Sequence, residues 1–122
     1  MSIFRVDCEI QNPESPGKSV HIKQLLVDTG AEYSWVAAAS LAKAAIKVRK
    51  KDVPFLMANG QTITRDVGYA IIRADGFETV DEVVFARPGD LQLLGSRTLE
   101  GFAAVVDPRR KKLVAAGPIP AA

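Results

Sequence analysis

The sequence contains only one cysteine, Cys8, and one histidine, His21, among its 122 residues. A single cysteine excludes a disulfide within the chain and any metal site built from a cysteine cluster. A single histidine leaves a histidine-rich metal site or a serine-type catalytic triad without the residues it needs. We expect Cys8 to be a packed thiol on a strand and His21 to be an ordinary strand residue. The sequence therefore predicts a protein that uses no metal and no cofactor.

Long apolar runs and a strong net charge are also missing. No stretch of about 18 apolar residues is present that could cross a membrane, and the first residues do not form a basic-then-apolar leader. The formal net charge is +2, which is too small to indicate binding to nucleic acid or to a membrane surface. We expect a cytoplasmic protein with neither kind of partner.

Two basic clusters stand out from this balanced charge. The first consists of Lys47, Arg49, Lys50 and Lys51, and the second spans residues 109–112. Both are short and lack interleaved aromatic residues, so they do not favour nucleic-acid binding. We predict that the first cluster lies at the end of a helix and the second in a hairpin turn.

The composition that is present is that of an ordinary globular protein, with 48% hydrophobic and 25% charged residues. A chain of this length can close one modest core and is too short for two. We therefore expect one domain spanning residues 1–122.

Most of the chain alternates between apolar and polar residues in the manner of β-strands. Asn59-Gly60 predicts a two-residue hairpin turn, Ala74-Asp75-Gly76 predicts a second tight turn, and Gly68 predicts a bulge. The predicted strands span residues 3–10, 19–27, 32–36, 53–58, 61–73, 80–86, 91–95, 103–106 and 111–115.

One or two short helices interrupt these strands. Apolar residues recur on one helical face from Ala37 to about Val48, and alanine is the best helix former. Ser96 is predicted to cap a brief second helix over residues 97–102. The fold class that follows is all-β with one or two short helices.

The most informative stretch is Leu25-Leu26-Val27-Asp28-Thr29-Gly30-Ala31. Its apolar residues predict a buried strand, and an ionised carboxylate at the end of such a strand is costly to desolvate without partners or a chemical task. Thr29 supplies a hydroxyl group, and Gly30 permits a sharp turn or the close approach of another group. From these residues alone, a strand that ends in an Asx turn is the other interpretation.

Asp28-Thr29-Gly30-Ala31 after an apolar strand resembles the active-site loop of the retropepsin-like aspartic proteases, the single-domain relatives of pepsin. Ala58-Asn59-Gly60-Gln61 falls where the flap tip of that family lies. Leu93-Leu94-Gly95 falls where the family has a strand that packs beside the catalytic loop. The resemblance extends over roughly residues 3–114 and implies the β-barrel fold of the retropepsin-like acid proteases.

The chain is more similar to the bacterial members of this family than to the viral ones, and it departs from the viral pattern in two places. Leu99-Glu100-Gly101-Phe102 and the later Val106-Asp107-Pro108 are similar to the bacterial branch of the family. The flap carries fewer glycines than the viral enzymes do, and the C-terminal strands are longer. The contacts of the viral dimers are therefore not carried over to this chain.

The resemblance implies a chemistry that needs two carboxylates. Aspartic proteases use a pair of aspartates that share one proton, whereas this chain has one Asp-Thr-Gly, and Asp75 and Asp107 lie in predicted turns. A complete site therefore requires a homodimer in which Asp28 meets Asp28 across a two-fold axis. In the family, the equivalent of Thr29 would hydrogen-bond across the axis and that of Gly30 would lie against the peptide.

The same resemblance assigns roles to neighbouring residues. The hairpin tip, Ala58-Asn59-Gly60-Gln61, would be a flap that closes over a peptide or protein substrate. Glu32 stands where the family often presents a polar group to the substrate, so it is a candidate substrate contact. Tyr33 and Trp35 either line a substrate pocket or pack in the core, and packing is the favoured interpretation.

Two functions remain open from the sequence. The first is a homodimeric aspartic endopeptidase in which Asp28 is catalytic. The second is a non-catalytic retropepsin-like module for dimerisation or peptide binding. The intact Asp28-Thr29-Gly30 favours the endopeptidase, because a scaffold has no need of a desolvated acid.

Overall fold

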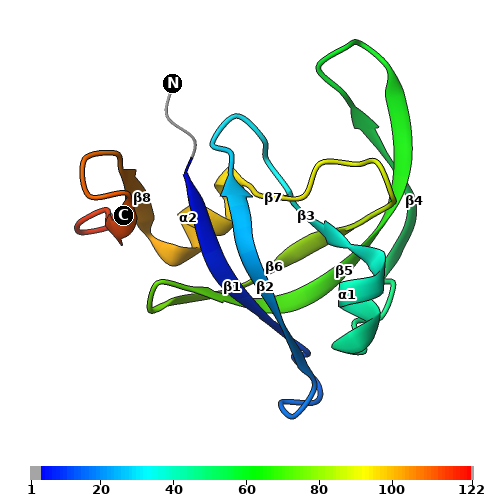
Figure 1. The fold of residues 1–122 in the computed structure, drawn as a ribbon, viewed down its shortest axis with the longest axis horizontal. Coiled ribbons are helices and arrows are strands. Elements are labelled where there is room, and N and C mark those ends of the chain that lie inside the picture. Colours follow the sequence, from blue (N-terminus) through cyan, green and yellow to red (C-terminus); the bar gives the residue numbers. More distant parts are fainter. Residues whose placement is uncertain (1–3, 122) are drawn as a thin grey trace.

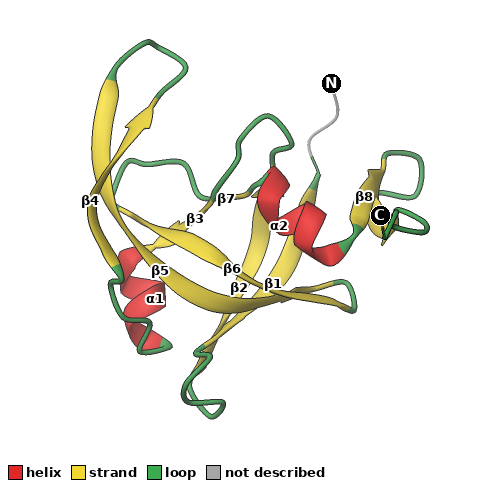
Figure 2. Cartoon of the chain, turned by 180° about the vertical axis from the view of Figure 1, so that it is seen from behind, coloured by secondary structure: helices red, strands yellow, loops and turns green. Residues whose placement is uncertain are grey.

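The computed structural model describes residues 4–121. Nine strands and two short helices occur within these residues, so the all-β prediction is confirmed (Figures 1 and 2). In chain order they are β1 (Arg5–Gln11), β2 (Ser19–Val27), β3 (Ser34–Ala37), α1 (Ala38–Lys43), β4 (Lys50–Leu56), β5 (Thr62–Ala74), β6 (Phe77–Ala86), β7 (Leu93–Leu94), α2 (Ser96–Phe102), β8 (Ala104–Asp107) and β9 (Lys112–Ala115).

Seven strands form one sheet in the order β1-β2-β7-β3-β6-β5-β4. Strand β1 also pairs with β5, from Cys8 opposite Ala74 to Gln11 opposite Ile71, so the sheet returns on itself. The pairs β2–β7 and β3–β6 are parallel, and the others are antiparallel. Strands β8 and β9 form a separate two-stranded sheet.

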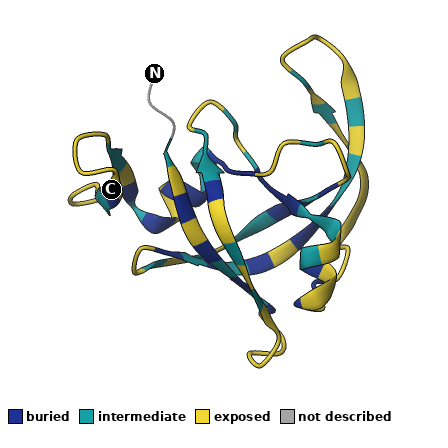
Figure 3. Cartoon of the chain, viewed as in Figure 1, coloured by how far each residue is buried: buried dark blue, intermediate teal, exposed yellow. Residues whose placement is uncertain are grey.

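Alternating burial along the strands fills the interior of this curved sheet (Figure 3). On β1, Val6, Cys8 and Ile10 point inward and are buried. They belong to a large cluster that also contains Ile72 of β5 and Leu94 of β7. Burial raises the pKa of the Cys8 thiol to about 12, as expected for a packed thiol.

A second, smaller cluster lies at the base of the β4–β5 hairpin. Its buried members are Trp35, Val67, Val84, Ala86 and Leu93. Side chains of β4, Phe55 among them, pack against it. The two clusters divide the interior, and the smaller one supports the hairpin that rises from the body (green in Figure 1).

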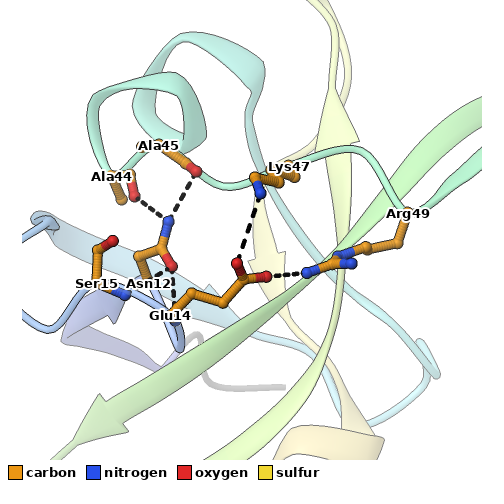
Figure 4. A network of polar contacts seen from close by, with 7 residues as sticks. All are labelled: Asn12, Glu14, Ser15, Ala44, Ala45, Lys47 and Arg49. Atoms are coloured by element: carbon orange, nitrogen blue, oxygen red, sulfur yellow. Dashed lines mark hydrogen bonds and ion pairs between the residues drawn. The ribbon is translucent and has the colours of Figure 1, made fainter.

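Helix α1 is shorter than predicted, because it ends at Lys43 and not near Val48. Ala45 turns the chain into the left-handed region with φ 55°, and the Ile46 amide donates to the Leu41 carbonyl at 3.0 Å. The buried Asn12 side chain then donates to the carbonyls of Ala44 and Ala45 at 3.1 and 2.7 Å (Figure 4). A residue of the β1–β2 loop thus satisfies the helix end.

The first basic cluster therefore follows the helix at a distance instead of decorating its last turn. Lys47 and Arg49 both bind the carboxylate of Glu14 in the β1–β2 loop (Figure 4). Lys50 binds Glu82 of β6 at 2.7 Å. Since three of its four cations have acidic partners, the cluster has the character of a solvated ion-pair network.

Two further local predictions are wrong. Gly68 makes no bulge, because the β5–β6 register runs through it without a shift. A Cβ there would lie 2.7 Å from the Lys47 carbonyl, so this glycine allows close backbone approach. The irregularity sits instead in β4, where the register shifts between Lys50 and Val53 and Asp52 has φ 52°. Ser96 does not cap α2, because Gly95 occupies the N-cap position.

The remaining segments follow the sequence pattern closely. Strand β2 has the predicted bounds, and the Asp75-Gly76 turn has positive φ at both residues, 50° and 83°. Strand β6 begins three residues earlier than predicted, and β7 is reduced to two residues. Ile3, the predicted start of the first strand, lies outside the described residues. No helix in the described part of the chain is long and apolar enough to cross a membrane.

Candidate active site

Asp28 is positioned by two parallel strands. Leu26 and Val27 at the end of β2 pair with Leu93 and Leu94 of β7, and the Asp28 amide donates to the Leu94 carbonyl at 2.9 Å. The paired ends of both strands are apolar: Leu93 and Leu94 are buried, and Leu26 and Val27 are partly buried against the two core clusters. The carboxylate therefore follows directly on the apolar end of β2, which is paired with β7 against the core.

The loop after Asp28 closes on its own side chain. Asp28 Oδ1 accepts a hydrogen bond from the Gly30 amide at 2.9 Å, and the Ala31 amide donates to the Asp28 carbonyl at 3.2 Å. These contacts form the Asx turn that the sequence permits. Asp28 itself is half-buried, whereas Thr29 and Gly30 are exposed. The turn fixes the orientation of the carboxylate and leaves the loop accessible.

The start of α2 fastens the other end of this loop. The amides of Ser96 and Arg97 donate to the carbonyls of Ala31 and Glu32 at 2.7 and 3.0 Å. Gly95 permits this approach, since a Cβ there would lie 2.4 Å from the Tyr33 carbonyl oxygen. The strand that contains Leu93-Leu94-Gly95 therefore lies directly beside the loop that carries Asp28.

A chain of buried hydroxyl groups lies behind the loop and was missed by the sequence analysis. The Gly95 amide donates to Ser34 Oγ at 2.9 Å, and Ser34 Oγ lies 2.6 Å from Thr98 Oγ1. The Thr98 hydroxyl donates to Asp81 Oδ2 at 2.9 Å. Ser34 and Thr98 are fully buried. A serine among the apolar residues of β3 was the only local signal.

A groove of about 760 Å³ opens above Asp28. From the segments that line it, we call residues 28–35 its floor, β4 with Met57 and Ala58 one wall, and residues 89–93 the other wall. Its lining residues are Asp28, Gly30, Ala31, Glu32, Tyr33, Trp35, Val53, Pro54, Phe55, Leu56, Met57, Ala58, Gly89, Asp90, Leu91 and Leu93. Most of these side chains are apolar, as in sites that bind peptides or other partly apolar ligands.

The predicted site residues are only partly gathered in this groove. Asp28, Gly30, Ala31, Glu32 and Ala58 line it. The others lie nearby on exposed backbone: Thr29 in the loop, and Asn59, Gly60 and Gln61 at the hairpin tip. The predicted hydrogen bond of Thr29 across a dimer axis involves a second chain, so it stays a prediction.

The hairpin tip differs in detail from the predicted turn. The Met57 amide donates to the Gln61 carbonyl at 2.8 Å, and the Gly60 amide donates to the Met57 carbonyl at 2.9 Å. Gly60 has φ 84°, whereas Asn59 does not have positive φ. A two-residue type I′ turn needs positive φ at both central residues. The tip is therefore a longer connection, in which Asn59 Oδ1 accepts from the Gln61 amide at 2.9 Å.

Tyr33 and Trp35 both line the groove and pack against neighbouring aromatic residues, so the two roles predicted as alternatives occur together. Each lies 5.2 Å, between ring centroids, from Phe55 of β4, and each also lines the groove. Trp35 is buried in the smaller core cluster. On its other side, Tyr33 faces the guanidinium of Arg97 at 4.5 Å. The two rings thus support the hairpin from the floor of the groove.

Among the described residues, three carboxylates line the groove: Asp28, Glu32 and Asp90. Only Asp90 forms an ion pair with a basic side chain in the described part of the chain. Asp90 is held by Arg65, whose Nε and second guanidinium nitrogen lie 2.7 and 2.8 Å from its oxygens. This pair holds the pKa of Asp90 below its usual value. Asp28 and Glu32 remain. No group of three or more His, Cys, Asp or Glu side chains within residues 4–121 is arranged to hold a metal.

Comparison with known proteins agrees with this geometry. The fold matches the crystal structure of the retroviral protease-like domain of Ddi1 from Leishmania major, with a TM-score of 0.59, 17% sequence identity, and coverage of 97% of this chain and 91% of that one. The molecule thus has the fold of the retropepsin-like proteins. Residues 14–109 match the model of an aspartyl protease family, and the chain belongs to that family. No curated protein matches the sequence.

Proposed function

We propose that the protein is an aspartic endopeptidase that works as a homodimer, with one Asp28 from each chain activating a water for peptide-bond hydrolysis. The observation that carries this proposal is the position of Asp28, held by Leu94 and Gly30 on the floor of an apolar groove of about 760 Å³. Membership of the aspartyl protease family supports the same chemistry. A cytoplasmic location and peptide or protein substrates are part of the proposal.

The chemistry requires the two carboxylates to differ in protonation. One ionised Asp28 accepts a proton from the water as its oxygen attacks the scissile carbonyl carbon, and the protonated Asp28 donates its proton to the carbonyl oxygen. The tetrahedral intermediate then collapses: the carboxyl group that gained the water's proton donates it to the leaving amine, and the other carboxylate takes a proton from a hydroxyl of the intermediate, which restores the singly protonated pair. Two carboxylates about 3 Å apart cannot both ionise, which keeps the pair in this singly protonated state.

A second copy of the chain is the best source of the second carboxylate. Asp75 and Asp107 do not line the groove and are occupied by backbone amides, from Leu113 in the first case and from Arg109 and Arg110 in the second. Asp90 is bound to Arg65. Glu32 is exposed at the groove rim, which suits a contact with the substrate backbone or side chains better than a shared proton.

The walls of the groove support a preference for apolar residues at the scissile bond. Phe55, Met57, Leu91 and Leu93 all line it. The β4–β5 hairpin forms the wall that would close over a bound peptide and exclude water, which is the usual task of a flap. No cofactor takes part in this mechanism.

The proposal is tested by incubating the purified dimer with a library of unstructured peptides from about pH 4 to 7. We expect cleavage between apolar residues, fastest below neutrality, and none by Asp28→Asn. Absence of cleavage at every pH, from a protein shown to be dimeric, would favour the non-catalytic module for dimerisation or peptide binding.

A further inference from the structure

The β4–β5 hairpin leaves the body of the protein at a definite point. Strand β5 pairs with β6 from Val67 opposite Val84 to Ala74 opposite Phe77. On the tip side of Val67, β5 pairs only with β4, and Arg65 lies opposite Val53. Arg65 is therefore at the base of the hairpin, where backbone pairing to the main sheet has just ended.

The segment that follows β6 approaches the same point from the other side. Strand β6 ends at Ala86, and the next residues form a turn in which the Asp90 amide donates to the Arg87 carbonyl at 3.0 Å. Asp90 Oδ2 accepts from the Arg87 amide at 2.8 Å, so the carboxylate also closes its own turn. Gly89 has φ 92°, which favours glycine there.

The contact between these two segments is a two-point ion pair. Arg65 Nε and its second terminal nitrogen lie 2.7 and 2.8 Å from Asp90 Oδ2 and Oδ1. The remaining guanidinium nitrogen donates to the Thr64 carbonyl at 2.7 Å, which holds the arginine itself in place. The two side chains are only 13% and 15% exposed, so water screens this pair less than it screens the other ion pairs of the surface.

This pair joins the two walls of the groove. Val53 to Ala58 of the hairpin line one wall, and Gly89, Asp90 and Leu91 line the other. Each wall carries a leucine that is largely exposed in the single chain, Leu56 at 77% and Leu91 at 71%. The distance between the two walls therefore depends on the Arg65–Asp90 ion pair, which joins the base of the hairpin to the 89–91 segment.

We propose that Arg65 and Asp90 are positioning residues whose ion pair tethers the base of the flap to the 89–91 segment and so sets the width of the groove before a peptide enters. The tether limits outward motion of the hairpin, while the tip beyond residue 57 stays free to move. This inference rests on the proposed function only where it concerns catalysis. The tether itself is a property of the free protein.

Hydrogen exchange in the unliganded protein tests the tether without any assay of activity. We compare Arg65→Met with Arg73→Met, which removes a second arginine from the same strand. Arg73 is 36% exposed and binds Glu78 at 2.6 Å at the far end of β5. We expect amide exchange over residues 53–57 to become about fivefold faster in Arg65→Met and to stay unchanged in Arg73→Met.

Asp90→Asn completes the design, because it removes the charge and keeps the shape. We expect the same acceleration as in Arg65→Met, and no further acceleration in the double variant, since both changes break one contact. Arg65→Lys keeps the positive charge but cannot form both hydrogen bonds of the guanidinium group. Its amide exchange rate should therefore lie between those of the wild type and Arg65→Met. Equal effects of Arg65→Met and Arg73→Met, additive effects in the double variant, or acceleration spread evenly over β1 and β6 would each overturn the tether.

Kinetics with a cleaved peptide then tests its consequence for the groove. We expect Arg65→Met to raise KM about threefold and to change kcat by less than about twofold. Without the ion pair, the peptide itself has to bring the two walls of the groove together, and this uses part of its binding free energy. A loss of kcat at constant KM would contradict a positioning role. If the wild-type protein cleaves no peptide, the proposed function fails, whereas the exchange experiment still decides whether the tether exists.

Discussion

The amide of Asp28 donates to the carbonyl of Leu94 across a separation of 2.9 Å. This bond continues the parallel pairing of β2 with β7 by one residue, so the candidate catalytic acid is the last member of this strand pairing. Immediately after Leu94, Gly95 lets the backbone of Tyr33 pass close by. The geometry of the acid therefore depends on a strand that lies 66 residues later in the sequence.

Gly95→Ala should destabilise the protein by about 3 kcal/mol, because its new Cβ would meet backbone atoms that cannot move aside. The nearest are the carbonyl oxygens of Tyr33 at 2.4 Å and Glu32 at 2.5 Å. Gly17→Ala is the matched control, since nothing lies within 4 Å of a Cβ at that position. Urea unfolding of both variants measures the difference. Equal midpoints would show that the loop yields more easily than its contacts indicate.

Ser34→Ala should lower stability by about 2 kcal/mol, because it leaves the buried Gly95 amide without its acceptor and removes one of the two hydrogen-bond partners of the Thr98 hydroxyl, which keeps only Asp81. The same change at Ser15, which is exposed in the β1–β2 loop, should be close to neutral. Chemical denaturation compares the two. If Ser34→Ala is as stable as Ser15→Ala, the hydroxyl chain does not hold the loop.

The ion pair of Arg65 with Asp90 gives a pH dependence whose sign can be stated. The hydrogen bonds from Arg65 are the main cause that holds the pKa of Asp90 below 3.8. Its contribution to stability is therefore complete above that ordinary value and is lost as the pH falls through the lower pKa of the folded state.

Asp90→Asn should accordingly be less stable than the wild type by about 1 kcal/mol near pH 6. The difference should shrink in strong acid, at a pH below the lowered pKa of Asp90, where the wild-type carboxylate also becomes neutral. Urea titrations at the two pH values measure it. A difference that is the same at both would mean that the charge of Asp90 contributes nothing.

Asp28→Asn should retain the dimer and lose cleavage. In the proposed dimer, two ionised aspartates brought together would repel, so association of the wild-type chains would be favoured at low pH, where one aspartate holds a proton, and would lose this advantage as the pH rises. The amide variant has no such penalty, and its dimer should be equal or tighter near pH 7, by about 1 kcal/mol. Sedimentation equilibrium tests this, and a variant that dissociates at neutral pH would make Asp28 a structural anchor.

Features with a local signature were predictable from the sequence. The bounds of β2 follow from its alternation and apolar end, and the turn at Asp75-Gly76 follows from residues that tolerate positive φ. The family resemblance rested on the same kind of signal, because Asp28-Thr29-Gly30 is contiguous. The family match and the retropepsin-like fold confirm it.

Features that depend on distant residues were not predictable. Helix α1 ends early where the Asn12 side-chain amide donates to the carbonyls of Ala44 and Ala45, which lie more than 30 residues away in the sequence. The Ser34–Thr98 contact joins residues 64 apart in the sequence. Arg65 and Asp90 carried no pattern that distinguished them from other surface charges. These features depend on contacts between residues that are far apart in the sequence, and the short-range pattern of apolar and polar residues gives no information about such contacts.

Subunit mixing tests the central claim, that each site uses one Asp28 from each chain, most directly. Wild-type protein at a fixed concentration is refolded together with an increasing excess of Asp28→Asn, and peptide cleavage is measured after dimers have formed. We predict that cleavage falls toward zero as wild-type chains become trapped in mixed dimers with a single carboxylate. Cleavage that stays constant while the excess rises would show that one chain carries a complete site, and would contradict the account.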